Sequence, residues 1–209
     1  EALGVTDIIS LNCVANGLFP HNPEPLPENL HAISNAMRKQ KAHVGFAVDP
    51  DVDRLAIICE DGSMFGEEYS LVAIADYILQ HKKGPTVSNL SSTRALKDIT
   101  EKRGGKYYAS AVGEVNVVEM MKKTHAVIGG EGNGGIIYPE LHYGRDALVG
   151  IALFLSHLAK SGKTCHTLRE TYPDYYISKN KIILTPEINT EKIFTSIESK
   201  YKKQRINKD

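Results

Sequence analysis

Hydrophobic residues recur along the chain in two patterns that alternate with each other. Short apolar runs bounded by turn residues predict strands, and longer stretches with apolar residues three and four positions apart predict amphipathic helices. Residues 67–81 show the second pattern, with Leu71, Ile74, Ala75 and Ile78 on one helix face. The predicted strands cover residues 43–49, 54–60, 84–90, 106–112 and 125–130, and the predicted helices cover residues 28–41, 67–81, 94–103, 115–123 and 147–160. Strands that alternate with helices predict an α/β fold with largely parallel sheets.

A turn signal near residue 62 divides this pattern into two predicted domains. Asp61 and Gly62 end the second strand, and Glu67 begins the next helix. We therefore expect one domain over residues 1–66 and another over residues 67–175, each with a mixed or parallel sheet flanked by helices.

The last part of the chain, residues 176–209, carries a predicted strand at 181–184 and a predicted helix at 190–203. This segment is expected to be a connector or the start of a further, truncated domain. The chain begins at Glu1 without an initiator methionine and finishes in a polar stretch. We therefore expect the sequence to be a piece of a longer protein.

The amino-acid composition argues against several classes of protein. Lys and Arg number 25, Asp and Glu number 25, and Trp is absent, which argues against a general nucleic-acid binder with a clustered basic face. No apolar run approaches the roughly 20 residues that span a bilayer, so no membrane partner is expected. The three cysteines form no CxxC pair, which is typical of a reduced, cytoplasmic protein rather than a disulfide scaffold.

The first stretch that carries chemistry is the loop DPDVDR, residues 49–54, between two predicted strands. Its three carboxylates, on Asp49, Asp51 and Asp53, repel one another unless a cation lies among them, and hard oxygen ligands suit Mg²⁺ or Ca²⁺. Arg54 beside them can bind a phosphate through two hydrogen bonds. The combination indicates a metal that bridges to a phosphate.

A calcium loop is the first alternative. The three aspartates and Glu60 occupy positions 1, 3, 5 and 12 of an EF-hand loop. Arg54, however, stands where the sharp turn needs glycine, and the flanking segments are predicted strands rather than helices. A non-catalytic Ca²⁺-binding module nevertheless stays open as an alternative function.

The second stretch is the glycine loop GGEGNGG, residues 129–135, which follows a predicted strand. Its spacing satisfies GxGxxG, but the β-branched, proline-stopped residues 136–139 do not start the helix that a dinucleotide site needs. A nucleotide-binding oxidoreductase is therefore the weaker alternative. Glycines let a backbone approach a ligand closely, and the side chains of Glu131 and Asn133 can hydrogen-bond vicinal sugar hydroxyls.

Together the two loops resemble those of the α-D-phosphohexomutases, a family that includes phosphoglucomutase and phosphomannomutase. The proline-rich stretch FPHNPEPLPENL, residues 19–30, resembles the segment before that family's metal loop. The stretch HYGRDALVGIALFL, residues 142–155, resembles the helix start after its sugar loop. The order and rough spacing of all four agree, and the similarity covers nearly the whole chain.

The resemblance implies an isomerase that interconverts hexose 1-phosphate and hexose 6-phosphate through a phosphoserine and Mg²⁺. Such enzymes have four domains around a cleft, and this chain resembles the second and third. No segment resembles the phosphoserine loop of the first domain or the phosphate-binding loop of the fourth. The resemblance thus implies a phosphorylated hexose as ligand, the missing domains as partners in the same chain, and no mutase activity for these residues alone.

Carried over by motif, Asp49, Asp51 and Asp53 would bind Mg²⁺, and Arg54 would lie by the transferring phosphoryl group. Within the glycine loop, Glu131 would bind sugar hydroxyls.

The glycine loop also departs from the family pattern. Asn133, next to Gly132, would share the sugar hydroxyls with Glu131, although many relatives carry Ser in place of Asn133. Some relatives carry Lys where Ser91 stands and His where Gly135 stands, so those acid–base groups cannot be transferred. In this chain we expect two other residues to replace that Lys and His: His142 as a catalytic group and Arg145 as a substrate-binding group.

Overall fold

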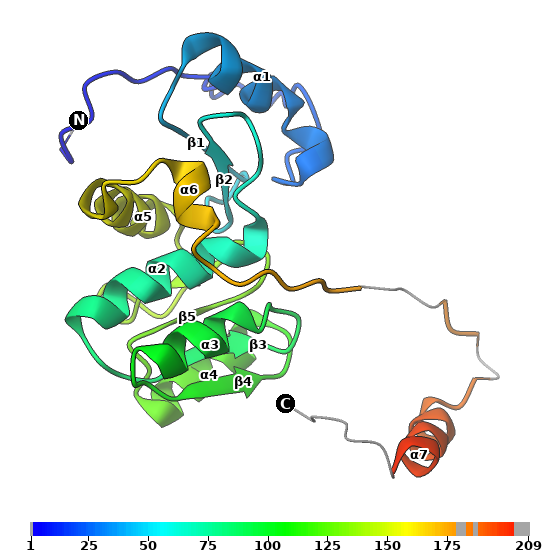
Figure 1. Ribbon diagram of the computed structural model, residues 1–209. Helices are drawn as coiled ribbons and strands as arrows, with labels where there is room; N and C mark the ends of the chain where they lie inside the picture. The colour runs from blue at the N-terminus through cyan, green and yellow to red at the C-terminus, as the bar shows by residue number, and fades with distance from the viewer. Residues whose placement is uncertain (1, 179–182, 186–187, 203–209) are drawn as a thin grey trace. The chain divides into compact units, whose positions relative to one another are not determined.

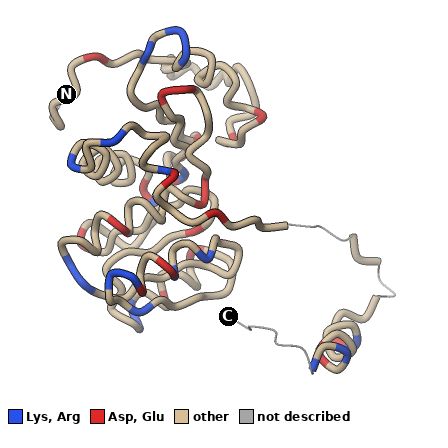
Figure 2. Tube along the Cα trace, viewed as in Figure 1, with Lys and Arg blue, Asp and Glu red and all other residues tan. Residues whose placement is uncertain are grey.

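The computed structural model describes residues 2–178, 183–185 and 188–202 (Figure 1). The chain forms two compact units, Glu1–Tyr175 and Tyr176–Asp209. None of the described helices combines the length and the apolar character needed to cross a membrane. Lys and Arg are interspersed with Asp and Glu along the trace (Figure 2).

In the first unit, residues 2–26 hold no helix or strand, and two helical segments and a small sheet follow them. The 3₁₀ helix η1 (Pro27–Asn29) precedes helix α1 (His31–Gln40), so the predicted helix at 28–41 is interrupted at Leu30. Strands β1 (Val44–Val48) and β2 (Leu55–Cys59) confirm the two predicted strands. They pair antiparallel, with Val48 opposite Leu55, so that the loop carrying the three aspartates is the hairpin connection.

The second sheet has the order β4-β3-β5-β6. Strand β3 (Thr86–Asn89) pairs in parallel with both β4 (Tyr107–Ser110) and β5 (Ile128–Gly130), and the short strand β6 (Ile136–Ile137) joins antiparallel to β5. The parallel pairing that the alternating pattern predicted is found here. Because the chain moves from β3 to β4 on one side and then crosses to β5 on the other, its strand order reverses between β3 and β5.

Helices cover both faces of the second sheet. Thr86 of β3 bonds Thr100 of α3 (Ala95–Lys102), with 2.7 Å between the hydroxyl oxygens. The adjacent Val87 packs with Val117 and Met121 of α4 (Glu114–Thr124). Since successive side chains of a strand point to opposite faces, α3 and α4 lie on opposite faces. The α/β prediction is therefore confirmed.

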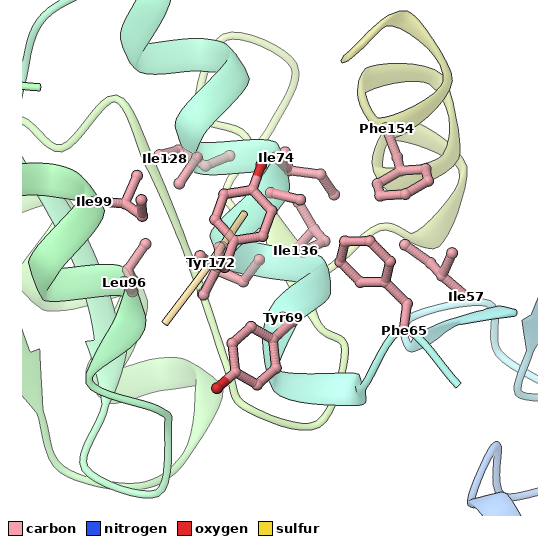
Figure 3. Close-up of a cluster of buried hydrophobic side chains, with 14 of the residues drawn as sticks. Ile57, Phe65, Tyr69, Ile74, Leu96, Ile99, Ile128, Ile136, Phe154 and Tyr172 are labelled. Atoms are coloured by element: carbon pink, nitrogen blue, oxygen red, sulfur yellow. The ribbon is translucent and has the colours of Figure 1, made fainter. Parts of the chain in front are cut away.

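Helix α2 (Glu67–His81) is the centre of the main hydrophobic core, and its predicted bounds are confirmed. Figure 3 shows side chains gathered around it, among them Ile57 of β2, Ile128 of β5 and Phe154 of α5 (Ala147–Ser161). Phe65 and Phe154 stack edge to face with ring centroids 5.0 Å apart. The strand after the aspartate loop and the strand before the glycine loop are thus fixed on one core, although the predicted domain boundary after residue 66 stays a prediction.

The chain then passes through α6 (Cys165–Arg169) and ends in the second unit, which carries α7 (Thr190–Tyr201). Asn189 caps α7 by accepting a hydrogen bond from the Lys192 backbone N–H at 3.0 Å. This helix confirms the one predicted from residue 190 but ends at Tyr201, and residue 203 of the prediction lies outside the described residues. The predicted strand at 181–184 falls partly outside the described residues, and its described part, residues 183–184, is not in a strand.

Candidate functional site

The aspartate loop is a tight turn organised by its own first residue. Asp49 is buried, and its Oδ1 accepts hydrogen bonds from the backbone N–H groups of Asp53 at 3.1 Å and Arg54 at 3.0 Å. Val52 adopts a left-handed backbone with φ of 57°, which a β-branched residue rarely does. Strained backbone of this kind is concentrated at functional sites, where the surrounding contacts hold it in place.

The three aspartates converge. One carboxylate oxygen from each of Asp49, Asp51 and Asp53 lies within 4.8 Å of the others. Oδ1 of Asp53 is buried and accepts no hydrogen bond from the described residues. Burial raises the pKa of Asp53 to about 6, the carboxylates of Asp49 and Asp51 act in the same direction, and Arg145 opposes them. A set of oxygen ligands in which one buried oxygen accepts no hydrogen bond from the described residues fits Mg²⁺.

Arg54 follows this cluster and is held among carboxylates. Its Nε lies 3.1 Å from Oδ2 of Asp49, and its Nη1 donates to Glu24 at 3.2 Å. The side chain keeps about 30% of its surface exposed. The guanidinium is therefore anchored next to the aspartates while part of it faces solvent.

In the glycine loop, the buried Glu131 follows the carboxyl end of β5. Its Oε1 accepts from Nδ2 of Asn89 at 2.7 Å and from the backbone N–H of Gly113 at 3.3 Å, while its Oε2 accepts from Nη1 of Arg145 at 2.8 Å. Asn89 ends β3, so the Asn89–Glu131 pair lies where the strand order of the sheet reverses. Ligands of open α/β sheets bind outside the carboxyl ends of strands at such points.

The glycines of this loop are required by close packing. A Cβ at Gly132 would lie 2.6 Å from the Ser91 carbonyl oxygen, and one at Gly134, where φ is 87°, would lie 2.4 Å from the Leu55 carbonyl oxygen. Asn133 between them uses Oδ1 to accept from the Gly135 N–H at 3.2 Å, which leaves its amide protons to donate elsewhere. Strand β6 follows the loop, so no helix begins there, as the sequence predicted.

The structure brings the two loops into direct contact. The Leu55 N–H donates to the Gly134 carbonyl at 3.1 Å, and Arg54 and Gly135 form an isolated antiparallel bridge. The two loops therefore line one site, built from segments about 80 residues apart in the sequence.

Arg145 links the acidic groups of the two loops. Its Nη2 bonds Oδ2 of Asp53, its Nη1 bonds Glu131, and its Nε lies 3.3 Å from Oε2 of Glu114. Its backbone N–H also donates to Oε1 of Glu114 at 3.1 Å. The guanidinium is thus held by one carboxylate from the aspartate loop, one from the glycine loop and one from the start of α4.

His142 pairs with a different carboxylate from those that hold Arg145. It is half exposed, and Nε2 lies 3.0 Å from Oδ2 of Asp146. Asp146 is the N-cap of α5 and accepts from the N–H groups of Leu148 and Val149 through its Oδ1. The partner of His142 is therefore the cap of α5 rather than an aspartate of the loop or Glu131.

Sequence reasoning missed three side chains that hold the site together: Asn89, Glu114 and Glu24. A signal existed for Asn89, because it is a polar residue near the end of the strand predicted at residues 84–90. Glu114 begins a helix, where an acidic residue is commonly explained by the helix dipole, and Glu24 sits among prolines without a pattern.

Two family models match most of the chain. Residues 1–62 match the family model for "Phosphoglucomutase/phosphomannomutase, alpha/beta/alpha domain II", and residues 66–175 match the model for domain III.

Individual proteins of known family also match most of this chain. A phosphoglucomutase/phosphomannomutase of Thermococcus kodakarensis is 34% identical over 83% of this chain and 39% of its own length. A phosphomannomutase/phosphoglucomutase of Pseudomonas putida is 31% identical over 91% of this chain and 40% of its own length. A crystal structure of a family protein from Burkholderia thailandensis superposes with a TM-score of 0.68 at 28% identity, covering 74% of this chain and 34% of that one. The chain thus spans about two fifths of the length of the curated relatives, and it belongs to the phosphoglucomutase/phosphomannomutase family.

Proposed function

We propose that this chain supplies the metal-binding and sugar-binding loops of a phosphohexomutase, which interconverts hexose 1-phosphate and hexose 6-phosphate. The observation that carries the proposal is the bridge formed by Arg145 between Asp53 and Glu131. That bridge makes one site of two loops with different chemistry, one suited to a cation and phosphate and the other to hydroxyl groups. Family membership supports the reaction class.

In this proposal, Asp49, Asp51 and Asp53 hold Mg²⁺ through carboxylate oxygens. The bound ion neutralises charge on the phosphoryl group during transfer, and positioning accounts for most of the remaining rate enhancement. Arg54 contributes a fixed cation beside the same phosphoryl group. Its anchoring by Asp49 and Glu24 keeps the guanidinium in place, while its exposed part can donate to phosphate oxygens.

Glu131, Gly132 and Asn133 bind the sugar in this proposal. Three donors already hold Glu131, so its carboxylate has a fixed orientation and about one lone-pair position left for a hydroxyl. The free amide protons of Asn133 can donate to a neighbouring hydroxyl oxygen. A pair that both accepts and donates can bind vicinal hydroxyls in either orientation of the ligand, which a bisphosphate that turns over between half-reactions requires.

Arg145 and His142 have different roles in this proposal. Arg145 acts mainly as a positioning residue, because its guanidinium is engaged by three carboxylates. His142 is the candidate acid–base group, since a carboxylate that pairs with one ring nitrogen orients the imidazole for proton transfer at the other.

We further propose that these 209 residues alone have no mutase turnover. Phosphoryl transfer needs a donor in line with its acceptor, and the groups described above position the ligand, neutralise charge and exchange protons but supply no phosphoryl group. The portion of the relatives that this chain does not match would supply the phosphoserine and the remaining phosphate contacts. The assay is conversion of glucose 1-phosphate or mannose 1-phosphate with Mg²⁺ and a catalytic amount of the 1,6-bisphosphate. Turnover that copurifies with the chain through repeated purification contradicts this part of the proposal.

A chimera tests the reaction class itself. Residues 1–175 replace the matching segment of the Thermococcus kodakarensis relative, which aligns over 176 residues. The folded chimera is expected to convert hexose 1-phosphate, to lose that activity with Asp51→Asn, and to keep it with Asp7→Asn, an exposed aspartate outside both loops. Circular dichroism establishes that each protein is folded. A folded chimera without turnover, or one that the Asp51→Asn change leaves active, contradicts the proposal.

A further inference from the structure

A second group of potential metal ligands lies where β2 meets α6. Cys59 is the last residue of β2 and fully buried, Asp61 lies in the turn that follows, and His166 lies in the first turn of α6. One donor atom from each lies within 4.8 Å of the others. Nδ1 of His166 is 3.3 Å from Oδ2 of Asp61. Figure 1 shows α6 beside β2, which brings together residues more than 100 positions apart.

The two half-exposed groups are oriented as metal ligands are. Oδ1 of Asp61 accepts from the Ser63 N–H at 2.8 Å and from the Ser63 hydroxyl at 2.6 Å, which leaves Oδ2 facing His166. The far nitrogen of His166, Nε2, lies 3.4 Å from Oε1 of Glu170. Metal-binding histidines usually donate their second ring N–H to a carboxylate, which fixes the tautomer that leaves the first nitrogen free to bind.

The sulfur of Cys59 is the third donor atom of this group, within 4.8 Å of donor atoms of Asp61 and His166. A hydrogen bond from the Cys165 thiol lowers the pKa of Cys59, burial opposes this, and a hydrogen bond from Ser63 acts with Cys165. The thiolate is the form that binds metal ions.

We propose that Cys59, Asp61 and His166 form a zinc site that is separate from the aspartate loop. Zn²⁺ takes sulfur, imidazole nitrogen and carboxylate oxygen in a tetrahedral set, whereas the all-oxygen aspartate cluster suits Mg²⁺. Asp61 and His166 each keep nearly half of their side-chain surface exposed, at 49% and 45%, so water completes the fourth position. Such an ion would cross-link the end of β2 to α6 and so fasten the part of the chain that carries the aspartate loop to the part that carries the glycine loop.

The test uses the reduced 209-residue chain in excess Mg²⁺, which occupies hard oxygen ligands without competing for sulfur. We expect one equivalent of Zn²⁺ after dialysis, and a Co²⁺ complex with a thiolate-to-metal absorption band in the near ultraviolet. Cys59→Ser is expected to abolish the band, while Cys13→Ser, an exposed cysteine in the N-terminal segment, keeps it. A wild-type chain without the band, or a band that survives in Cys59→Ser, overturns the proposal.

Because Cys59 is buried, its replacement can also disturb folding, and a second pair of variants decides in that case. His166→Gln changes a half-exposed side chain and is expected to weaken Zn²⁺ binding more than tenfold, while His21→Gln, an exposed histidine elsewhere, leaves it unchanged. Glu170→Gln is expected to weaken binding by about tenfold through the orientation of His166. Unchanged Zn²⁺ affinity in His166→Gln overturns the proposal.

Discussion

The aspartate loop and the glycine loop meet in one site, but their buried carboxylates differ in how many hydrogen bonds the protein donates to them. Glu131 in the glycine loop accepts three hydrogen bonds, which hold its carboxylate in one orientation and leave about one lone-pair position for a ligand. Asp53 in the aspartate loop keeps a buried oxygen without a hydrogen bond, and its pKa is raised to about 6. The carboxylate of the glycine loop is therefore oriented in advance, whereas we expect the aspartate loop to be stabilised only when a cation binds. This contrast is what a site needs when one half recognises a neutral sugar ring and the other handles phosphate.

The largest effect is expected from adding a methyl group where the glycine loop packs closely against β2. Gly134→Ala places a Cβ 2.4 Å from the Leu55 carbonyl oxygen at a φ of 87°. Backbone strain and overpacking together should lower the free energy of unfolding by about 4 kcal/mol. Gly104→Ala is the matched control, because its φ is 76° with no atom within 4 Å, and it should cost about 1 kcal/mol. Denaturant unfolding measures both, and equal costs would refute the close contact between the loops.

The second-largest effect tests how strongly the contact with Arg145 stabilises Glu131. Glu131→Gln keeps the shape of the side chain but removes the charge that faces Arg145, and it should lower the free energy of unfolding by about 2–3 kcal/mol. Glu119→Gln, at an exposed position of α4, should change stability by less than about 0.5 kcal/mol. The comparison is made by urea unfolding, and a Glu131 variant as stable as the Glu119 variant would contradict the role of the Arg145 bridge.

A smaller effect concerns pH and the aspartate loop. The pKa of Asp53 is raised from 3.8 to about 6 in the folded chain, so the folded state holds this proton more tightly than the unfolded state does. Its contribution to stability is therefore present below about pH 4 and is lost as the pH rises to about 6. Urea midpoints of wild type and Asp53→Asn across this range, without Mg²⁺, should show the wild type losing stability relative to the variant. A constant difference would show that the Asp53 carboxyl is not under strain.

The smallest effect on stability is expected at Asp51, which is exposed. Asp51→Asn should change the free energy of unfolding by less than about 0.5 kcal/mol. The same change should weaken Mg²⁺ binding more than tenfold, because it removes one of three carboxylates. Calorimetric titration with Mg²⁺ checks this, with Asp7→Asn as the control. Equal Mg²⁺ affinity in the two variants would place the ion elsewhere.

Local patterns were enough to predict most of the fold. Helix α2 was found with its observed ends because an apolar face of regular spacing lies between Gly66 and the basic end at His81. Helix α1 was less well defined, since the prolines before it form a separate 3₁₀ turn that periodicity alone cannot distinguish from the helix.

The residues of the two loops could also be proposed as site residues from the sequence, but the contacts between them could not. Asp53 and Arg145 are 92 positions apart, and their contact depends on how β2 and α5 pack against the shared core. Val52 could not be recognised as left-handed either, because the strain of its backbone is imposed by hydrogen bonds to Asp49 that only the folded turn contains.

The central claim, that the two loops form one site for a cation and a phosphorylated sugar, is tested most directly by linkage. Titration of glucose 1,6-bisphosphate into the chain, with and without saturating Mg²⁺, measures the coupling free energy between the two ligands. We expect Mg²⁺ to tighten bisphosphate binding at least fivefold, Asp51→Asn to remove that dependence, and Glu131→Gln to weaken binding with and without the metal. The account would be contradicted by a bisphosphate affinity that is the same with and without Mg²⁺. It would also be contradicted if Mg²⁺ tightened bisphosphate binding to the Asp51→Asn variant as it does to the wild type.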